Sequence, residues 1–131
     1  MSGELFEKAD IVYSYTRKQA IEDGELVDVS KTAIECGIKI PVAVTRALWD
    51  GYIVPDKRSR PYGQSEAGRL WDVLFILRQA ARSSPVISAL FLFEVIFIQK
   101  LRQRRLVKLK AVCGPGDDGL PVITLMLPNE D

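Results

Sequence analysis

Apolar and polar positions alternate near the C-terminus of the chain. In residues 106–113 every odd-numbered position is apolar, and residues 122–127 again place apolar side chains at the odd-numbered positions. A period of two indicates strands with one buried face. Residues 114–119, which lie between them, are all glycine, proline or aspartate, the residue types that a chain reversal needs. This stretch therefore predicts two antiparallel strands joined by a turn.

A helical period dominates residues 65–83. Apolar side chains recur there every three or four positions, which predicts one long amphipathic helix. We expect Trp71, Leu74 and Leu77 to be buried against the strands, because they belong to the widest apolar stripe of the helix. Arg69 lies among the polar positions and is expected to face solvent.

Between the helix and the hairpin lies a nearly continuous apolar segment, residues 86–98, in which Glu94 is the only charged residue. A strand that is apolar on both alternating faces is typical of the centre of a sheet rather than its edge. We therefore expect a central strand here. Together with residues 106–113 and 122–127 it forms a C-terminal three-stranded meander.

Start signals for short helices precede these elements. Thr16 and Gln19 have the spacing of a capping box, which predicts a helix over Arg17–Asp23. Ser30 has the same role as N-cap of a second helix over residues 31–36. Each predicted helix is followed by a glycine, the usual residue at a helix C-terminus.

A third helix is expected to begin at Pro41 and to bury Trp49, because apolar residues follow Pro41 at helical spacing. Residues 26–29 are predicted to form a strand that extends the sheet. Residues 54–65 contain two prolines, one glycine and three basic residues without apolar periodicity, which is typical of an exposed loop.

These elements predict a single α+β domain over residues 1–131. Its mostly antiparallel sheet has a C-terminal three-stranded meander and is packed by one long helix and several short N-terminal helices. A chain of 131 residues suffices for one hydrophobic core and is short for two. With 47% hydrophobic and 27% charged residues, the composition is that of a soluble globular protein.

Composition also limits the location and the chemistry. The first residues lack the pattern of a signal peptide, and the longest apolar run, residues 89–98, is about half of the ~20 residues that a membrane helix needs. We therefore expect a cytoplasmic protein without membrane contact, with Cys36 and Cys113 as reduced thiols. The chain contains no histidine, which removes His-dependent catalysis and His-ligated metals. No catalytic residue, metal site or cofactor is predicted.

Charge is distributed unevenly along the chain. Residues 57–110 carry twelve Lys or Arg against three Asp or Glu, although the net charge of the whole chain is only +1. A basic hairpin of this kind can follow a phosphate backbone, whereas edge strands also use lysine to prevent aggregation. The candidate partner-binding residues are Lys57, Arg58, Arg60, Lys100, Arg102, Arg104, Arg105, Lys108 and Lys110.

A second group of side chains could line a small polar pocket. It consists of Tyr13, Tyr15, Arg17 and Asp28, and it is the alternative on which a small-ligand binder or a small enzyme using carboxylate or tyrosine chemistry would depend. In the simpler interpretation the tyrosines pack by strand alternation and Arg17 pairs with a carboxylate. The aspartates of residues 114–119 lack the acidic spacing of an EF-hand loop and are interpreted as turn residues.

Four sequence blocks resemble a family of uncharacterised proteins of about this length that bacteria, phages and plasmids carry. They are IVYSYTRKQAIEDGELVDVS, IPVAVTRALWD, GRLWDVL and LVKLKAVCGPGDDGLPVITLMLPNED. The chain departs from the family pattern at residues 52–62 and 85–99. The resemblance implies carriage on mobile elements, where small proteins without enzymatic activity often bind host or defence components. Our leading hypothesis is therefore a non-enzymatic binding module that engages a protein or nucleoprotein partner through the basic hairpin and the loop at residues 57–60.

Overall fold

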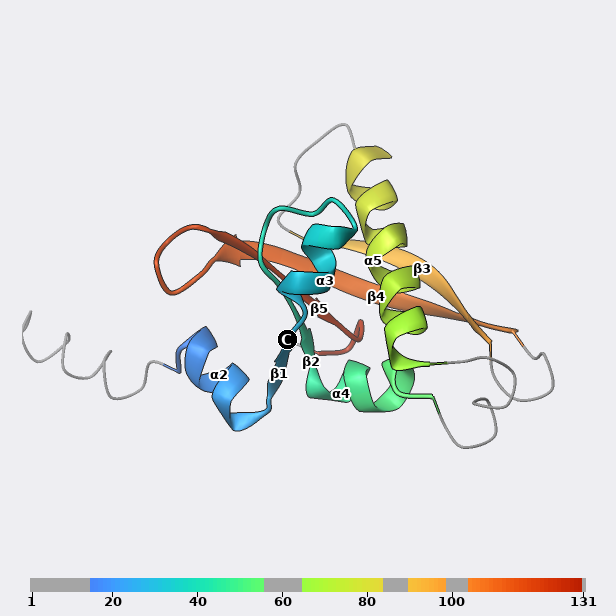
Figure 1. Cartoon of the computed structure of the whole chain (residues 1–131), viewed down its shortest axis with the longest axis horizontal. Helices are drawn as coiled ribbons and strands as arrows, with labels where there is room; N and C mark the ends of the chain where they lie inside the picture. Colours follow the sequence, from blue (N-terminus) through green and yellow to red (C-terminus); the bar gives the residue numbers. More distant parts are fainter. Residues whose placement is uncertain (1–14, 56–64, 84–89, 99–103, 131) are drawn as a thin grey trace, which may run out of the picture.

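The computed structural model describes residues 15–55, 65–83, 90–98 and 104–130. Its helical elements are α2 (Arg17–Asp23), α3 (Ser30–Glu35), α4 (Arg46–Leu48), the π-helix η1 (Trp49–Ile53) and α5 (Glu66–Ser83). Its strands are β1 (Leu26–Asp28), β2 (Val42–Thr45), β3 (Leu90–Ile98), β4 (Arg104–Pro115) and β5 (Pro121–Met126). Figure 1 shows α5 crossing the long strands β3 and β4, with α2 beside β1.

Within the described residues the strands form one sheet in the order β1-β2-β5-β4-β3. Strands β3, β4 and β5 form the predicted antiparallel meander, in which Leu90 is opposite Val112 and Pro115 is opposite Pro121. The strand β1 is antiparallel to β2, whereas β2 runs parallel to β5. The predicted α+β class, with a mostly antiparallel sheet and one long helix, is therefore confirmed.

The prediction of a helix from Pro41 is wrong, because residues Val42–Thr45 form strand β2. Its first three residues are fully buried. Valine is β-branched and favours strands, and an apolar run this short fits a buried strand as well as a helical stripe. The helical turn begins only at Arg46. Thr45 is its N-cap, and the Thr45 hydroxyl accepts a hydrogen bond from the Leu48 amide at 3.4 Å.

The expected central position of residues 86–98 is also wrong, because β3 lies at the edge of the sheet. Its odd-numbered residues from Phe93 to Phe97 are buried, whereas Leu92 and Ile96 are about half exposed. A strand with apolar residues on both faces has the sequence pattern of a central strand. This pattern does not show whether a second strand is present to pair with it.

The predicted capping box of α2 is confirmed. The Gln19 amide donates to the Thr16 hydroxyl at 3.0 Å, and the Thr16 amide donates to the Gln19 side-chain oxygen at 3.0 Å. The start of α3 differs from the prediction, since Ser30 is its first residue and not its N-cap. The Ser30 amide and hydroxyl donate instead to the Asp28 carboxylate at 3.0 and 2.6 Å.

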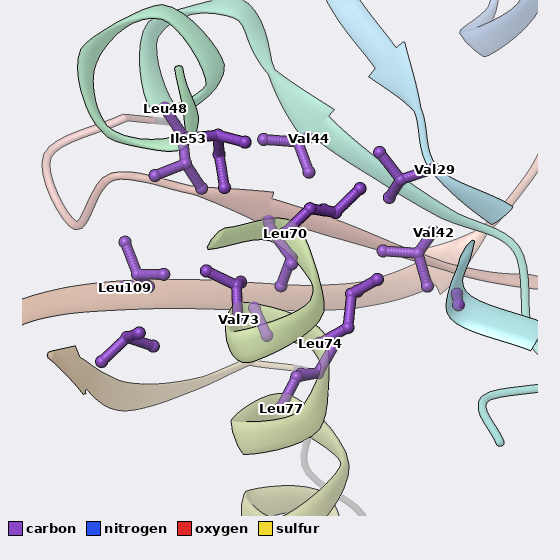
Figure 2. Packing of buried hydrophobic residues seen from close by; sticks show 14 of the residues in the cluster. Val29, Val42, Val44, Leu48, Ile53, Leu70, Val73, Leu74, Leu77 and Leu109 are labelled. Atoms are coloured by element: carbon purple, nitrogen blue, oxygen red, sulfur yellow. The ribbon is translucent and has the colours of Figure 1, made fainter. Parts of the chain in front are cut away.

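The hydrophobic core lies between α5 and one face of the sheet, which we call the inner face. Figure 2 shows Leu70, Val73, Leu74 and Leu77 of α5 pointing toward Leu109 and the other strand side chains. Leu74 and Leu77 are buried as predicted, with exposed fractions of 0% and 1%.

Two predictions about the surface of α5 are wrong. Trp71 is 43% exposed, whereas Arg69 is buried with an exposed fraction of 6%. The Arg69 guanidinium donates to the Tyr52 carbonyl at 2.8 Å and lies 5.7 Å from the centre of the Phe97 ring. A buried cation is tolerated when it is hydrogen-bonded and stacked on a ring. Because η1 and β3 supply these partners to Arg69, contacts with them decide which side of α5 is covered.

The outer face of the sheet, opposite α5, is covered only in part. Arg17 of α2 donates to the Thr124 hydroxyl at 2.7 Å, and Thr45 donates to the Glu130 carboxylate at 2.7 Å. Under these contacts Ala43 and Met126 are buried. The outer face of β3 and β4 has exposed apolar side chains instead.

Candidate functional site

Strand β4 holds four of the predicted basic residues. Arg104, Lys108 and Lys110 are even-numbered and point to the outer face, because the odd-numbered Val107 of the same strand is buried on the inner face. Arg105 therefore points to the inner side, at the end of the sheet. Arg104, Arg105 and Lys108 are exposed.

The neighbours of β4 reduce the free positive charge along the strand. The Lys110 ammonium is half-buried and donates a hydrogen bond to the Glu130 carbonyl. Glu94 of β3 lies opposite Lys108 in the strand register. The exposed basic side chains of β4 are therefore Arg104, Arg105 and Lys108, which we call the basic β4 cluster, and Glu94 offsets part of the charge of Lys108.

The aromatic ring of Tyr52, from η1, contacts Arg105 of this cluster. The Arg105 guanidinium lies 5.4 Å from the centre of the Tyr52 ring, and Tyr52 packs against Phe97 with ring centres 5.8 Å apart. A cation over a ring face is attracted by the ring quadrupole and loses little of its hydrogen-bonding capacity. Stacking therefore positions Arg105 while its N–H groups remain able to bind an anion.

A surface cavity of about 390 Å³ lies beside the cluster. Arg105, Lys108 and Asn129 are its polar lining residues, and Tyr52 supplies an aromatic wall. Leu106, Val107, Leu127 and Pro128 complete the lining. The cavity therefore combines two cations, a ring and an amide side chain over an apolar floor, a set that suits a flat anionic group.

The cavity follows from the unequal lengths of β4 and β5. Pairing between these strands ends at Lys110 and Met126, so among the described strands β3 is the only neighbour of the first residues of β4. The chain turns away after β5, where the Leu127 amide donates to the Glu130 carboxylate at 2.8 Å. This turn leaves one side of β4 open next to its basic residues.

Five predicted partner-binding residues lie outside the described residues, as does one of the predicted pocket residues. They are Lys57, Arg58, Arg60, Lys100 and Arg102 of the basic segments, and Tyr13 of the pocket.

Arg17 and Asp28, from the second predicted group, line one cavity of about 310 Å³ together with Asp117. The Arg17 guanidinium is already engaged, because it donates to the Thr124 hydroxyl and to the Ile123 carbonyl, both at 2.7 Å. Burial lowers the pKa of Arg17, and the charges of Asp28 and Asp117 oppose that shift. The arrangement fastens α2 to β5.

Asp117 of the β4–β5 turn caps helix α2 from a distant part of the chain. Its carboxylate accepts from the Arg17 amide at 2.9 Å and from the Lys18 amide at 3.0 Å. Hydrogen bonds from Lys18 and Arg17 lower the pKa of Asp117. Its neighbour Asp118 accepts from the Leu120 amide at 3.0 Å within the turn. The two aspartates thus satisfy backbone donors, as expected of turn residues and helix caps.

Tyr15 does not line that cavity. Its hydroxyl donates to the Asp23 carboxylate at 2.5 Å, across the ends of α2, and its ring is exposed. The hydrogen bond to Asp23 raises the pKa of Tyr15 to about 12. A tyrosine with a raised pKa stays protonated at neutral pH and is a poor general base.

The described residues contain neither a cluster of metal-ligating side chains nor a helix that could span a membrane. Within residues 15–55, 65–83, 90–98 and 104–130, no group of three or more Cys, Asp or Glu is arranged to hold a metal ion. Across the same part of the chain, no helix is long and apolar enough to cross a membrane. Cys36 is buried, Cys113 is half-buried, and both are free thiols.

Sequence reasoning missed the part that Tyr52 plays in the basic site. Tyr52 stands 53 positions before Arg105, and the helical spacing of apolar residues after Pro41 includes Tyr52, which suggests a core position instead. No sequence signal reveals this contact, because its two partners lie on segments that are far apart in the chain.

The fold and the site define a small α+β protein whose exposed basic strand borders an aromatic-walled cavity. The chain matches, over residues 2–131, the model of a family described as "Family of unknown function (DUF6573)", and it belongs to that family. No curated protein and no solved structure matches the chain.

Proposed function

We propose that this protein is a non-enzymatic binding module of a mobile genetic element, which engages an acidic protein or nucleoprotein partner through the basic β4 cluster. The observation that carries the proposal is the cavity lined by Arg105, Lys108 and Tyr52, in which the Arg105 guanidinium lies over the Tyr52 ring. Guanidinium and ammonium groups bind phosphates and carboxylates, and a ring beside them accepts a flat group by stacking.

The exposure of the cluster supports a role in binding rather than in stability. Arg104, Arg105 and Lys108 are exposed, and exposed charges contribute little to folding. In solution such charges attract an oppositely charged partner over about one Debye length, about 8 Å at physiological ionic strength. The apolar lining at Leu127 and Pro128 then offers contact area once the partner is in place.

The association with mobile elements rests on the resemblance of the four sequence blocks, and it suggests host or defence components as partners. Such partners include nucleic acids and proteins that themselves carry nucleic acid. The basic cluster suits both, because phosphate groups and acidic side chains present the same charge.

The proposal is tested by affinity capture from a bacterial lysate with and without nuclease. Wild-type protein is compared with the Arg105→Ala/Lys108→Ala double variant, and Lys31→Ala/Lys39→Ala serves as the control, since it removes the same charge from two exposed lysines elsewhere. We expect a partner that the wild type and the control capture and the double variant loses. Loss of that partner on nuclease treatment identifies a nucleoprotein. Equal capture by all three proteins refutes a role for the cluster.

A further inference from the structure

The edge strand β3 is unusually apolar for its position. Its nine residues, Leu90–Ile98, contain one charge, Glu94, and among the described strands β4 is its only neighbour. The other edge strand, β1, has three residues. Edge strands of soluble proteins are normally short, charged or interrupted by proline, because a long apolar edge pairs with other chains. Strand β3 has none of these protections beyond Glu94.

Exposed apolar side chains lie on both sides of this edge. On the outer face Leu92 is 51% exposed and Ile96 is 54% exposed. On the inner side Phe75 of α5 is 44% exposed. On the outer face Leu90 and Leu106 are also exposed, at 49% and 60%.

A cavity of about 380 Å³ joins the two sides along the edge. It is lined by Asp72, Phe75 and Ile76 from α5, by residues 94–96 of β3 and by Leu106 of β4. With roughly half of Leu90, Leu92, Ile96, Leu106 and Phe75 accessible, the patch offers on the order of 500 Å² per copy, more than half of the ~800 Å² that each partner contributes to a standard interface. Exposed apolar patches of this size often mark interaction sites.

We propose that a second copy of this chain covers the patch, with the two β3 strands paired antiparallel about a two-fold axis. Such pairing joins two five-stranded sheets into one and supplies hydrogen-bond partners to the outward backbone groups of residues 91–97. The same operation brings Phe75 of one copy toward α5 of the other, so each copy contributes the same surface to the interface. The proposal concerns the free edge of β3, whereas the cavity of the basic β4 cluster opens beyond the end of β5, although Leu106 lines both cavities.

Glu94 limits the register of this pairing. A two-fold axis at Glu94 would place two carboxylates directly opposite each other, about 4.5 to 5.5 Å apart between their Cβ atoms, which is unfavourable. An axis at Phe93 instead places Glu94 opposite Leu92 of the second copy, and an axis at Val95 places it opposite Ile96. Either arrangement keeps inner-face side chains together and outer-face side chains together.

The test is sedimentation equilibrium of the full chain between about 1 and 200 µM. The wild type is expected to have twice the 14.7 kDa mass of the chain, whereas Leu92→Lys and Phe75→Glu should each raise the dimer dissociation constant at least tenfold. Ile34→Lys is the control, because Ile34 is 63% exposed and lies on α3, away from β3. A monomeric wild type throughout this range overturns the proposal, and so does a dimer that withstands both substitutions.

Hydrogen exchange of the wild type provides a second readout that does not depend on the folding of any variant. Dimerisation slows exchange at outward amides of residues 91–97 as the protein concentration rises, and it leaves β1 amides unchanged. Protection of β3 that is independent of concentration, in a sample that sediments as a dimer, places the interface elsewhere and also overturns the proposal.

Discussion

Replacing Leu74 with alanine measures how strongly α5 is held against the sheet. Leu74 is completely buried and points into the cluster of side chains that Figure 2 shows between α5 and the strands. The substitution removes three carbon atoms, a loss of about 2.4 kcal/mol at ~0.8 kcal/mol per buried methylene. A residual cavity of roughly 50 to 80 Å³ adds about 1 to 2 kcal/mol. The expected loss in the free energy of unfolding is therefore about 3 to 4.5 kcal/mol.

Urea unfolding at fixed protein concentration, followed by circular dichroism, gives this value as a shift of the midpoint with an unchanged slope. The matched control is Ile34→Ala on α3, which removes a similar side chain that is 63% exposed. We expect this control to stay within about 0.5 kcal/mol of the wild type. If Leu74→Ala also stays within that range, α5 does not cover the sheet as described.

Three other predictions concern local interactions. Hydrogen bonds lower the pKa of Asp117. Its stabilisation of α2 is therefore present above the unfolded-state pKa of about 3.9 and is lost as pH falls through the lower folded-state pKa. Asp117→Ala should speed amide exchange in the first turn of α2 at neutral pH, and unchanged exchange would contradict the role of Asp117 as a cap. Cys113 should react with a maleimide before Cys36, whose pKa is raised by burial, and the reverse order contradicts this placement of the thiols. Gly37 has a φ of +91°, so Gly37→Ala should lower the free energy of unfolding in urea by about 1 to 2 kcal/mol. Gly51→Ala should lower it less, because the space around Gly51 is open. Equal effects of the two substitutions would show that the left-handed conformation is not required.

Sequence patterns predicted those features that depend on residues close together in the chain. The capping box of Thr16 and Gln19 involves positions three apart, and the β4–β5 hairpin is closed by a turn whose residue types are specific for turns. The stripe containing Leu74 and Leu77 is likewise a property of one helix. In each case the physical cause acts within a few residues, so the sequence pattern and the structure agree.

Pairing between distant segments was not predictable in the same way. The strand β2 lies parallel to β5, about 80 positions further along, and its short apolar run satisfies a helical period equally well. The edge position of β3 depends on which strands are left to pair with it. Burial of Arg69 and exposure of Trp71 depend on the position of η1, which contributes the carbonyl of Tyr52.

For the same reason, only part of the candidate site could be predicted from the sequence. The basic side chains of β4 lie close together in sequence, and strand alternation shows that Arg104 and Arg105 point to opposite faces. The meeting of Arg105 with Tyr52 and the helix cap provided by Asp117 join segments that are far apart. No local pattern indicates either contact.

Salt dependence of binding tests the central claim about the basic β4 cluster most directly. Wild-type protein is titrated into labelled duplex DNA, single-stranded RNA and poly-glutamate at several salt concentrations. We expect binding that weakens with salt, and in Arg105→Ala/Lys108→Ala we expect the log–log slope to fall by up to about 1.8 on the duplex or about 1.4 on the single strand, with Lys31→Ala/Lys39→Ala unchanged. Absence of salt-sensitive binding to all three polyanions, or an equal slope in the two double variants, would contradict the claim.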